Sequence, residues 1–211
     1  MDWQELEEVL QDCTHKRFNE AELAYLRQSY LEIERIWEKQ RRALSQIDYI
    51  ILGEAPLYGA NKRYIYSETG TPSSFLWPSD FPAYDKSQHG AGKTALWALL
   101  AENNMIVVDL FPYALNKNDT KSLTYRDVHR KGYLSFYRQV FRNFTAPKID
   151  DIRSENPGVS ILVRYKRILE NISPILQEMG FDEGVDVGGY VGVHSTHMGI
   201  NKKVFGRFCS A

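Results

Sequence analysis

Three short apolar runs stand out along this chain, and each of them is followed by an ionisable residue. They are 49–53 before Glu54, 105–108 before Asp109, and 190–193 before His194. Unbroken apolar runs of this length are typical of strands that are buried on both faces of a parallel sheet. Because the carboxyl ends of parallel strands meet at one edge, where ligands bind in open α/β folds, we expect these three side chains to share a cleft.

Helical patterns surround these strands, beginning in the amino-terminal part of the chain. The second helix has a start signal at Asn19, with Phe18 before it and Glu22 and Leu23 in its first turn,. Apolar residues then recur at spacings of three, four or seven, which predicts that one side of the helix packs in the core. These residues are Leu26, Tyr30, Ile33, Trp37 and Leu44.

The remaining elements alternate between strands and helices. We expect strands at 48–53, 105–109, 159–165 and 187–194, and helices at 91–102, 133–143 and 167–179. A strand, a crossover that contains a helix, and a parallel strand form a βαβ unit, which is almost always right-handed. This alternation predicts an α/β fold with a mainly parallel sheet.

Composition sets the class of protein. A chain of 211 residues with 43% hydrophobic content predicts one α/β domain over 1–211, with a helical part at 1–46 and the core at 47–211,. No apolar run approaches the length that crosses a bilayer, and the acidic start differs from a secretory signal, so we expect a cytoplasmic protein without membrane association,. Cys13 and Cys209 lack metal-like spacing and are expected to be reduced thiols,.

The connection between Pro56 and Gly90 is too long for a simple loop,. Its aromatic residues are too apolar to stay in water, so we expect it to pack over the sheet edge and to wall the cleft. Most of the rings would form a satellite core, and one or two would stack on a planar ligand. They are Tyr58, Tyr64, Tyr66, Phe75, Trp77, Phe81 and Tyr84.

Cations outnumber acids between 116 and 148, and aromatic residues are interleaved with them. This combination favours phosphate backbones and unstacked bases, although a helix with a solvated basic face has the same pattern. The cations are Lys117, Lys121, Arg126, Arg130, Lys131, Arg138, Arg142 and Lys148.

Two further motifs resemble ligand sites without meeting their requirements. The segment 87–94 is similar to a phosphate-binding loop, but Ser87 replaces the first glycine and the preceding residues lack the pattern of a buried strand,. His194 and His197 have a spacing that suits a helix, and no acidic residue follows nearby,. We therefore expect neither a metal site nor a cofactor.

The stretch Gly53-Glu54-Ala55-Pro56 resembles the first motif of the uracil-DNA glycosylase superfamily, in its Gly-Glu-Ala-Pro-Gly branch. Later segments follow in the order of that family, and the resemblance covers roughly 48–205. They are a glycine-containing helix start at 90–96, a strand that runs into a proline-containing segment at 107–112, and His194-Ser195 after the last strand, where the family has His-Pro-Ser.

The chain departs from the family pattern at four positions. Leu57 replaces the glycine that closes the first motif, and no proline separates His194 from Ser195. Ser87 falls where a phenylalanine usually precedes the helix start, and Asp109 stands near the position of the base-reading asparagine.

The resemblance implies a three-layer α/β/α sandwich with a short, mainly parallel central sheet, as in uracil-DNA glycosylases. It implies a DNA base-excision glycosylase that hydrolyses the N-glycosidic bond of uracil or another deaminated base. Breaking that bond develops positive charge on the sugar and negative charge on the departing base. We expect Glu54 or Asp109 to orient water and to stabilise the cation, and His194 to stabilise the leaving base.

The same resemblance implies contacts to DNA, whose target base would leave the duplex or come from a single strand. Substrate contacts are expected from Gly53, Ala55, Pro56, Tyr58, Phe111 and Ser195. Phosphate contacts are expected from Lys117, Lys121, Arg126, Arg130, Lys202 and Lys203,.

Each of the three ionisable residues also has a structural role open to it. Glu54 could cap the following turn, Asp109 could cap a helix or bind backbone amides, and His194 could be a buried histidine with satisfied hydrogen bonds. Two other functions therefore stay open. One is a non-catalytic nucleic-acid or nucleotide-binding protein of the same fold, and the other is a P-loop phosphohydrolase that depends on Lys93.

Overall fold

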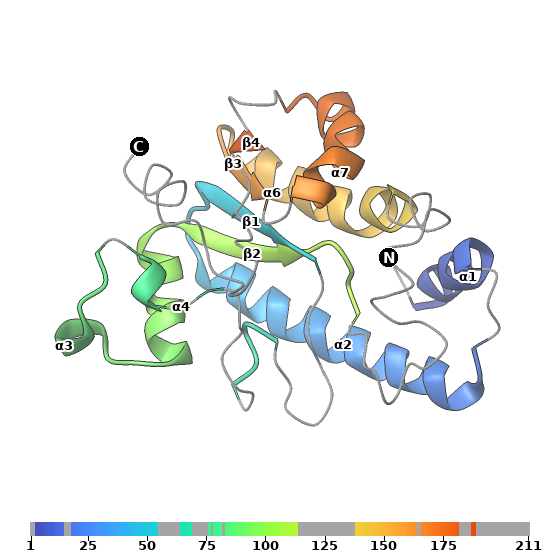
Figure 1. The fold of residues 1–211 in the computed structure, drawn as a ribbon, viewed down its shortest axis with the longest axis horizontal. Helices are drawn as coiled ribbons and strands as arrows, with labels where there is room; N and C mark the ends of the chain where they lie inside the picture. Colours follow the sequence, from blue (N-terminus) through green and yellow to red (C-terminus); the bar gives the residue numbers. More distant parts are fainter. Residues whose placement is uncertain are drawn as a thin grey trace.

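An open parallel sheet lies at the centre of the computed structural model (Figure 1). The structure describes residues 3–14, 18–54, 64–68, 76, 78–81, 83–113, 138–163, 166–181 and 187–188. The strands of this part of the chain are β1 (Tyr49–Gly53), β2 (Met105–Asp109), β3 (Ser160–Val163) and β4 (Val187–Gly188). They are ordered β2-β1-β3-β4, and every pairing between neighbours is parallel.

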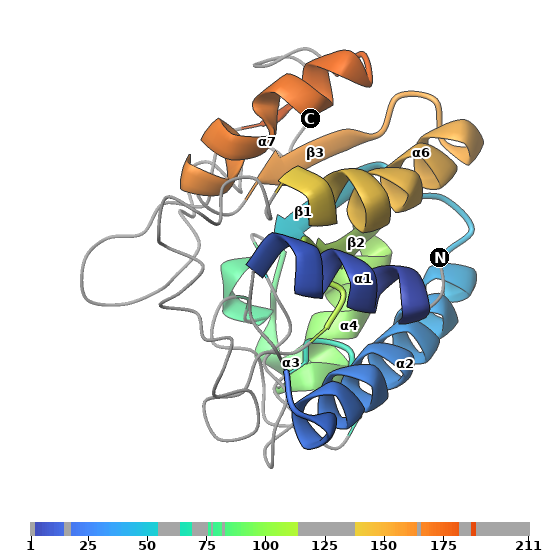
Figure 2. The ribbon, with the colours of Figure 1, turned by 90° about the vertical axis from the view of Figure 1, so that its right-hand side faces the viewer.

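Helices lie on both sides of this sheet. Figures 1 and 2 show α2 and α4 on one side and α6 and α7 on the other, which is compatible with the expected α/β/α layers. The helices are α1 (Trp3–Thr14), α2 (Glu20–Ala43), α3 (Lys86–His89), α4 (Lys93–Glu102), α6 (Ala146–Glu155) and α7 (Lys166–Glu178), with a 3-10 turn η1 (Pro78–Asp80) and a π-helix η4 (Phe141–Thr145).

The long helix α2 begins where the sequence predicts. The side chain of Asn19 accepts a hydrogen bond from the Glu22 N–H at 2.9 Å, and the Glu22 carboxylate accepts one from the Asn19 N–H at 3.2 Å. This reciprocal capping box satisfies two of the N–H groups that a helix start leaves without partners. The predicted stripe is buried along the helix, while Leu44 lies just past its end and is half-buried.

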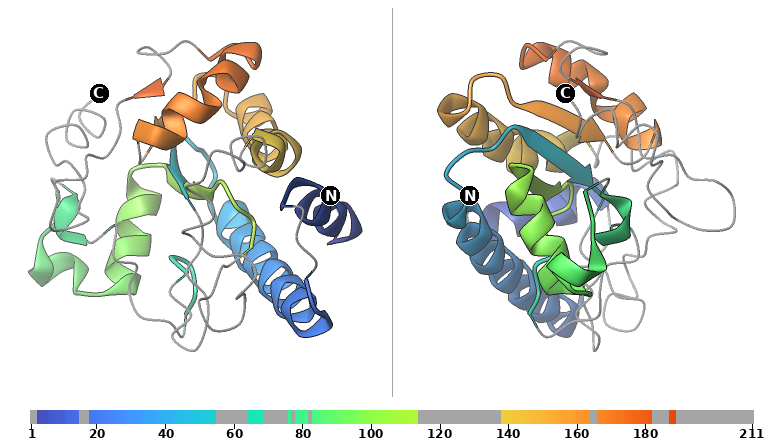
Figure 3. Two further views of the ribbon diagram at one scale, coloured as in Figure 1. Left: turned by 45° about the vertical axis from the view of Figure 1, so that its right-hand side comes forward. Right: turned by 90° about the vertical axis from the view of Figure 1, so that its left-hand side faces the viewer.

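The amino-terminal helices share one core with the sheet. Trp3 of α1 lies against Tyr30 of α2, with ring centroids 6.1 Å apart, and Figure 3 shows the two helices side by side. Both aromatic residues belong to the same hydrophobic cluster as the buried residues of β1, β2 and β3. Among the described residues, no helix has the length and apolar character needed to cross a bilayer.

The apolar runs at 49–53 and 105–108 form β1 and β2 as predicted, β3 lies within the predicted strand 159–165, and the helices α4 and α7 follow the predicted segments closely. The run at 190–193 lies outside the described residues. The described part of the predicted helix 133–143 is helical from 138, but it continues through η4 into α6, which the sequence pattern did not indicate. The last predicted strand is described over Val187–Gly188, and its remainder lies outside the described residues.

The outer edge of β2 is closed by two side chains that are distant in sequence. The Val107 N–H donates to the Tyr66 hydroxyl at 2.7 Å, and the Trp37 indole N–H donates to the Val107 carbonyl oxygen at 3.1 Å. Both hydrogen bonds are buried. An edge strand would otherwise present unpaired N–H and C=O groups to the core, so these bonds fix α2 and the segment 64–68 against the sheet.

Removing the hydroxyl group of Tyr66 tests this closure. We expect Tyr66→Phe to lower the free energy of unfolding in urea by about 1–3 kcal/mol, because the buried Val107 N–H loses its acceptor. The matched control is Tyr84→Phe, whose hydroxyl donates to the Gly90 carbonyl oxygen in an exposed position, and it should cost less than about 1 kcal/mol,. Equal losses in the two variants would contradict the role of Tyr66.

Candidate functional site

Two of the predicted site residues lie at the carboxyl ends of neighbouring parallel strands. Asp109 is the last residue of β2 and pairs in register with Gly53, the last residue of β1, and Glu54 follows directly. The main chain stays paired beyond the strands, because the Leu110 N–H donates to the Gly53 oxygen at 3.2 Å and the Phe111 N–H to the Glu54 oxygen at 3.0 Å. Glu54 and Asp109 are both half-buried. The sheet therefore brings these two acids to one edge.

Gly53 determines where the carboxylate of Asp109 can lie. A β-carbon built on Gly53 would overlap the Oδ1 atom of Asp109. The carboxylate thus lies directly over the last residue of β1 instead of pointing away from its neighbour strand. An alanine at this position would force the carboxylate into another orientation.

Two buried tyrosines lie within electrostatic range of this acid. Tyr64 and Tyr66 pack edge to face, with ring centroids 5.9 Å apart. Burial raises the pKa of Tyr64 well above its ordinary value of 10.0, and the charge of Asp109 is the second cause of this rise. Burial also raises the pKa of Tyr66. The hydrogen bond from the Val107 N–H lowers this pKa, and the charge of Asp109 raises it further. Both phenols stay neutral at physiological pH, so these two tyrosines add no charge to the surroundings of Asp109.

The loop that was expected to wall the cleft contributes mainly to the core in its described part. Tyr64, Tyr66 and Phe81 all belong to the central hydrophobic cluster, and Tyr84 packs against it half-buried. We expected most of these rings to form a satellite core, and the described rings instead belong to the central cluster or pack against it. The effect of the Asp109 charge on Tyr64 and Tyr66 could not be inferred from the local sequence.

The described cations of the basic stretch are engaged within the protein. The Lys148 ammonium pairs with Glu34 and lies 4.6 Å from the centroid of the Trp37 ring. Arg142 pairs with Glu178 at 2.9 Å, and Arg138 donates to a main-chain oxygen of α7 at 3.3 Å. Lys148 therefore fastens α6 to α2, and the phosphate contacts expected of the basic stretch stay a prediction.

Lys93 occupies the lysine position of the motif that resembles a phosphate-binding loop. Its ammonium donates to the main-chain oxygens of Tyr64 at 3.1 Å and Ser67 at 2.7 Å, and burial lowers its pKa to about 8. The short helix α3 precedes the glycine-containing turn, where a phosphate-binding loop has a strand,. In this structure Lys93 holds the turn at 64–68 in place.

Phe111 belongs to the hydrophobic core two residues after Asp109. Its ring is fully buried and packs near Tyr113, with centroids 5.9 Å apart. The preceding carbonyl oxygen, on Leu110, accepts a hydrogen bond at 2.7 Å from the buried Thr145 hydroxyl in η4. The π-helix thus anchors the chain just after Asp109. The substrate contact predicted for Phe111 stays a prediction.

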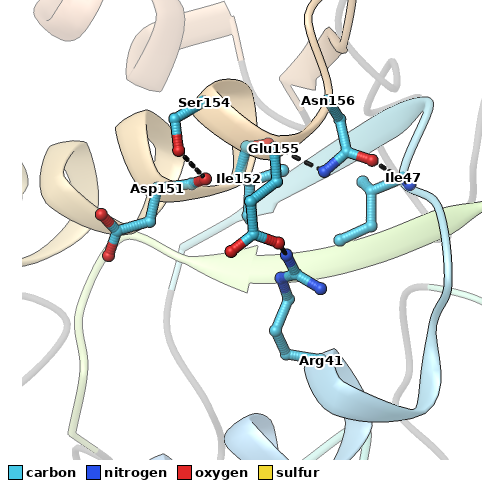
Figure 4. A network of polar contacts seen from close by, with 7 residues as sticks. All are labelled: Arg41, Ile47, Asp151, Ile152, Ser154, Glu155 and Asn156. Atoms are coloured by element: carbon cyan, nitrogen blue, oxygen red, sulfur yellow. Dashed lines mark hydrogen bonds and ion pairs between the residues drawn. The ribbon is translucent and has the colours of Figure 1, made fainter.

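A separate polar network lies at the amino-terminal end of β1, opposite the candidate site (Figure 4). The Asn156 side chain accepts from the Ile47 N–H at 2.8 Å and donates to the Ile152 oxygen at 2.8 Å, while Arg41 pairs with Glu155. A surface pocket of about 440 Å³ lies here, lined by Asp48, Glu155 and Asn156 among others. These polar groups bind the start of β1 to the end of α6, so we assign the pocket no function.

The remaining predicted site residues lie outside the described residues. They are Ala55, Pro56, Tyr58, Lys117, Lys121, Arg126, Arg130, His194, Ser195, Lys202 and Lys203. Within the described part of the chain, no three His, Cys, Asp or Glu side chains gather in a way that could hold a metal ion.

Comparisons of this chain with models of protein families, with curated proteins and with solved structures give no match. The function is therefore inferred from the residues at the carboxyl edge of the sheet.

Substituting Gly53 tests the packing of Asp109. We expect Gly53→Ala to lower the free energy of unfolding by about 1–3 kcal/mol. A crystal structure of the variant should show the Asp109 carboxylate displaced. The same substitution should cost at least about 0.5 kcal/mol less in an Asp109→Ala background, because the overlapping atom is absent. Additive costs in this double-mutant cycle would show that the two residues do not interact.

The half-buried amine of Lys93 predicts a pH dependence of stability. Between its folded pKa of about 8 and the ordinary value of 10.5, the unfolded chain binds a proton that the folded chain lacks, so rising pH favours the folded state,. From pH 7.5 to 9.5, the free energy of unfolding of wild type should rise by on the order of 1 kcal/mol relative to that of Lys93→Met. This figure is reduced because solvent screens the partly exposed amine. Urea unfolding at each pH measures this difference, with Lys39→Met as the control for an exposed lysine. Parallel curves for wild type and Lys93→Met would contradict the prediction.

Proposed function

We propose that this protein is a DNA base-excision glycosylase with the fold of the uracil-DNA glycosylases, acting in the cytoplasm. Uracil or another deaminated base is the substrate that its sequence resemblance implies. One observation carries the proposal, which is the placement of Glu54 and Asp109 at the ends of adjacent parallel strands. That edge is where open α/β sheets bind their ligands.

The chemistry of glycosidic cleavage fits this pair of acids. The transition state resembles an oxocarbenium ion, so a nearby carboxylate stabilises its charge and orients the attacking water. We assign this role to Glu54, which follows the paired register of β1, whereas the Asp109 carboxylate is held over Gly53. Asp109 is then placed to contact the substrate. A general base of this kind contributes about 10²–10⁴-fold to the rate.

The proposal extends to residues outside the described part of the chain. His194 would donate a hydrogen bond to the departing base, as its position after the third apolar run suggests,. Phosphates would be held by Lys117, Lys121, Arg126, Arg130, Lys202 and Lys203,.

A glycosylase assay tests the proposal directly. Single- and double-stranded oligonucleotides that carry uracil, hypoxanthine or xanthine are incubated with the protein and then treated with alkali, which cleaves abasic sites. We expect strand scission by wild type and a rate at least about 100-fold lower for Glu54→Gln. The matched control is Glu38→Gln, which changes an exposed glutamate of α2 and should leave the rate unchanged.

The outcomes separate the competing functions. Absence of scission on every substrate would contradict a glycosylase, and salt-dependent oligonucleotide binding in its place would support the non-catalytic nucleic-acid-binding protein. Magnesium-dependent ATP turnover that is lost in Lys93→Ala would support the phosphohydrolase.

A further inference from the structure

The helical run over 138–155 contains a π turn, η4, that contacts the chain just after β2. At the end of η4 the Ala146 N–H donates to the Phe141 oxygen, five residues earlier, where an α-helix would use the residue four positions back,. Such turns are rare, occur mostly as single turns inside α-helices, and are frequent at functional sites. The place of η4 within an otherwise α-helical run therefore directs attention to the side chains that it carries.

Thr145, the last residue of η4, makes a hydrogen bond outside its own helix. Serine and threonine hydroxyl groups in helices commonly donate to a carbonyl oxygen of the preceding turn. Ser29 in α2 does so, because its hydroxyl donates to the Leu26 oxygen at 2.9 Å. The Thr145 hydroxyl instead donates to the Leu110 oxygen at 2.7 Å, in a buried position. This bond joins η4 to a segment that lies 35 residues earlier in the chain.

The bond from Thr145 reaches both candidate acids through the main chain. Leu110 directly follows Asp109, and its N–H donates to the last residue of β1 at 3.2 Å. The next N–H, on Phe111, donates to the Glu54 oxygen at 3.0 Å. Leu110 is thus held by β1 through its N–H and by Thr145 through its carbonyl oxygen. The positions of the two strand ends relative to each other depend on both bonds.

We infer that Thr145 is a positioning residue of the candidate site, which sets through Leu110 how Glu54 and Asp109 lie relative to each other. This inference rests on the proposed glycosylase function and adds to it a residue that takes no part in the chemistry. Misplacing a reacting group by about 1 Å can cost about 100-fold in rate. Loss of the Thr145 hydroxyl should therefore slow the reaction although both acids are still present.

The kinetic test compares two substitutions of Thr145 in the full chain. Thr145→Val removes the hydroxyl group and keeps the branched shape of the side chain, whereas Thr145→Ser keeps the hydroxyl group. In the glycosylase assay, we expect kcat to fall about 10- to 100-fold in Thr145→Val and to stay within about 3-fold of wild type in Thr145→Ser. The matched control is Ser29→Ala, which removes a buried hydroxyl donor from α2 and should leave kcat unchanged.

A double-mutant cycle separates positioning from a general loss of stability. In a Glu54→Gln background, Thr145→Val should lower the rate by less than about 3-fold, because the catalytic carboxylate that it positions is already gone. The full loss in this background would overturn the inference. An equal loss of kcat in Ser29→Ala and Thr145→Val would overturn it as well, and so would an unchanged kcat in Thr145→Val, while the proposed function would stand in each case.

A second measurement is independent of catalysis. Hydrogen exchange of the main-chain amides is followed by NMR, with Ile51 in the middle of β1 as the reference. Relative to Ile51, the amides of Leu110 and Phe111 should exchange about 5- to 10-fold faster in Thr145→Val than in wild type, and Thr145→Ser should restore them. If wild type cleaves no oligonucleotide, the proposed function fails, and this faster exchange would still assign Thr145 to the positioning of the strand ends. Unchanged exchange at both amides would overturn the inference.

Discussion

The buried edge of β2 is the constraint on which the rest of this structure depends. Both main-chain groups of Val107 lie in the core, where a donor or acceptor without a partner costs about 1–3 kcal/mol,. Tyr66 and Trp37 supply the partners, and in doing so they bring the segment 64–68 and the helix α2 against the strand. The same packing places Tyr64 and Tyr66 within electrostatic range of Asp109. The surroundings of the candidate site therefore follow from the closure of a sheet edge.

Much of the fold was predictable from the sequence, because its signals are local. The capping residues Asn19 and Glu22 lie within one helical turn, and the apolar runs of β1 and β2 are each continuous. The helix α6 was missed, because Pro147 interrupts the pattern and is ordinarily a stop signal,. In the structure this proline lies at the start of α6, and the π-helix η4 leads into it without a break in the helical run.

The candidate site was predictable only as far as strand ends are visible in a sequence. Glu54 and Asp109 follow apolar runs, and parallel pairing brings them to one edge. The overlap between Gly53 and the Asp109 carboxylate depends on the register of two strands, which no local pattern specifies. Lys148 had the appearance of a surface cation, yet packing of α6 against α2 places it over Trp37. Contacts made by tertiary packing decide these roles, so residue type and spacing alone could not assign them.

The position of β1 in the middle of the sheet has a consequence for how the chain is made. β1 pairs with β2 on one side and with β3 on the other, and β3 leaves the ribosome long after β1. At about 5–20 residues per second, the nascent protein has a strongly apolar strand without its second neighbour for roughly 5–20 s. Strands in this condition promote aggregation. The amphipathic helix α2 is synthesised just before β1, so its apolar face is available to shield the strand until translation delivers β3.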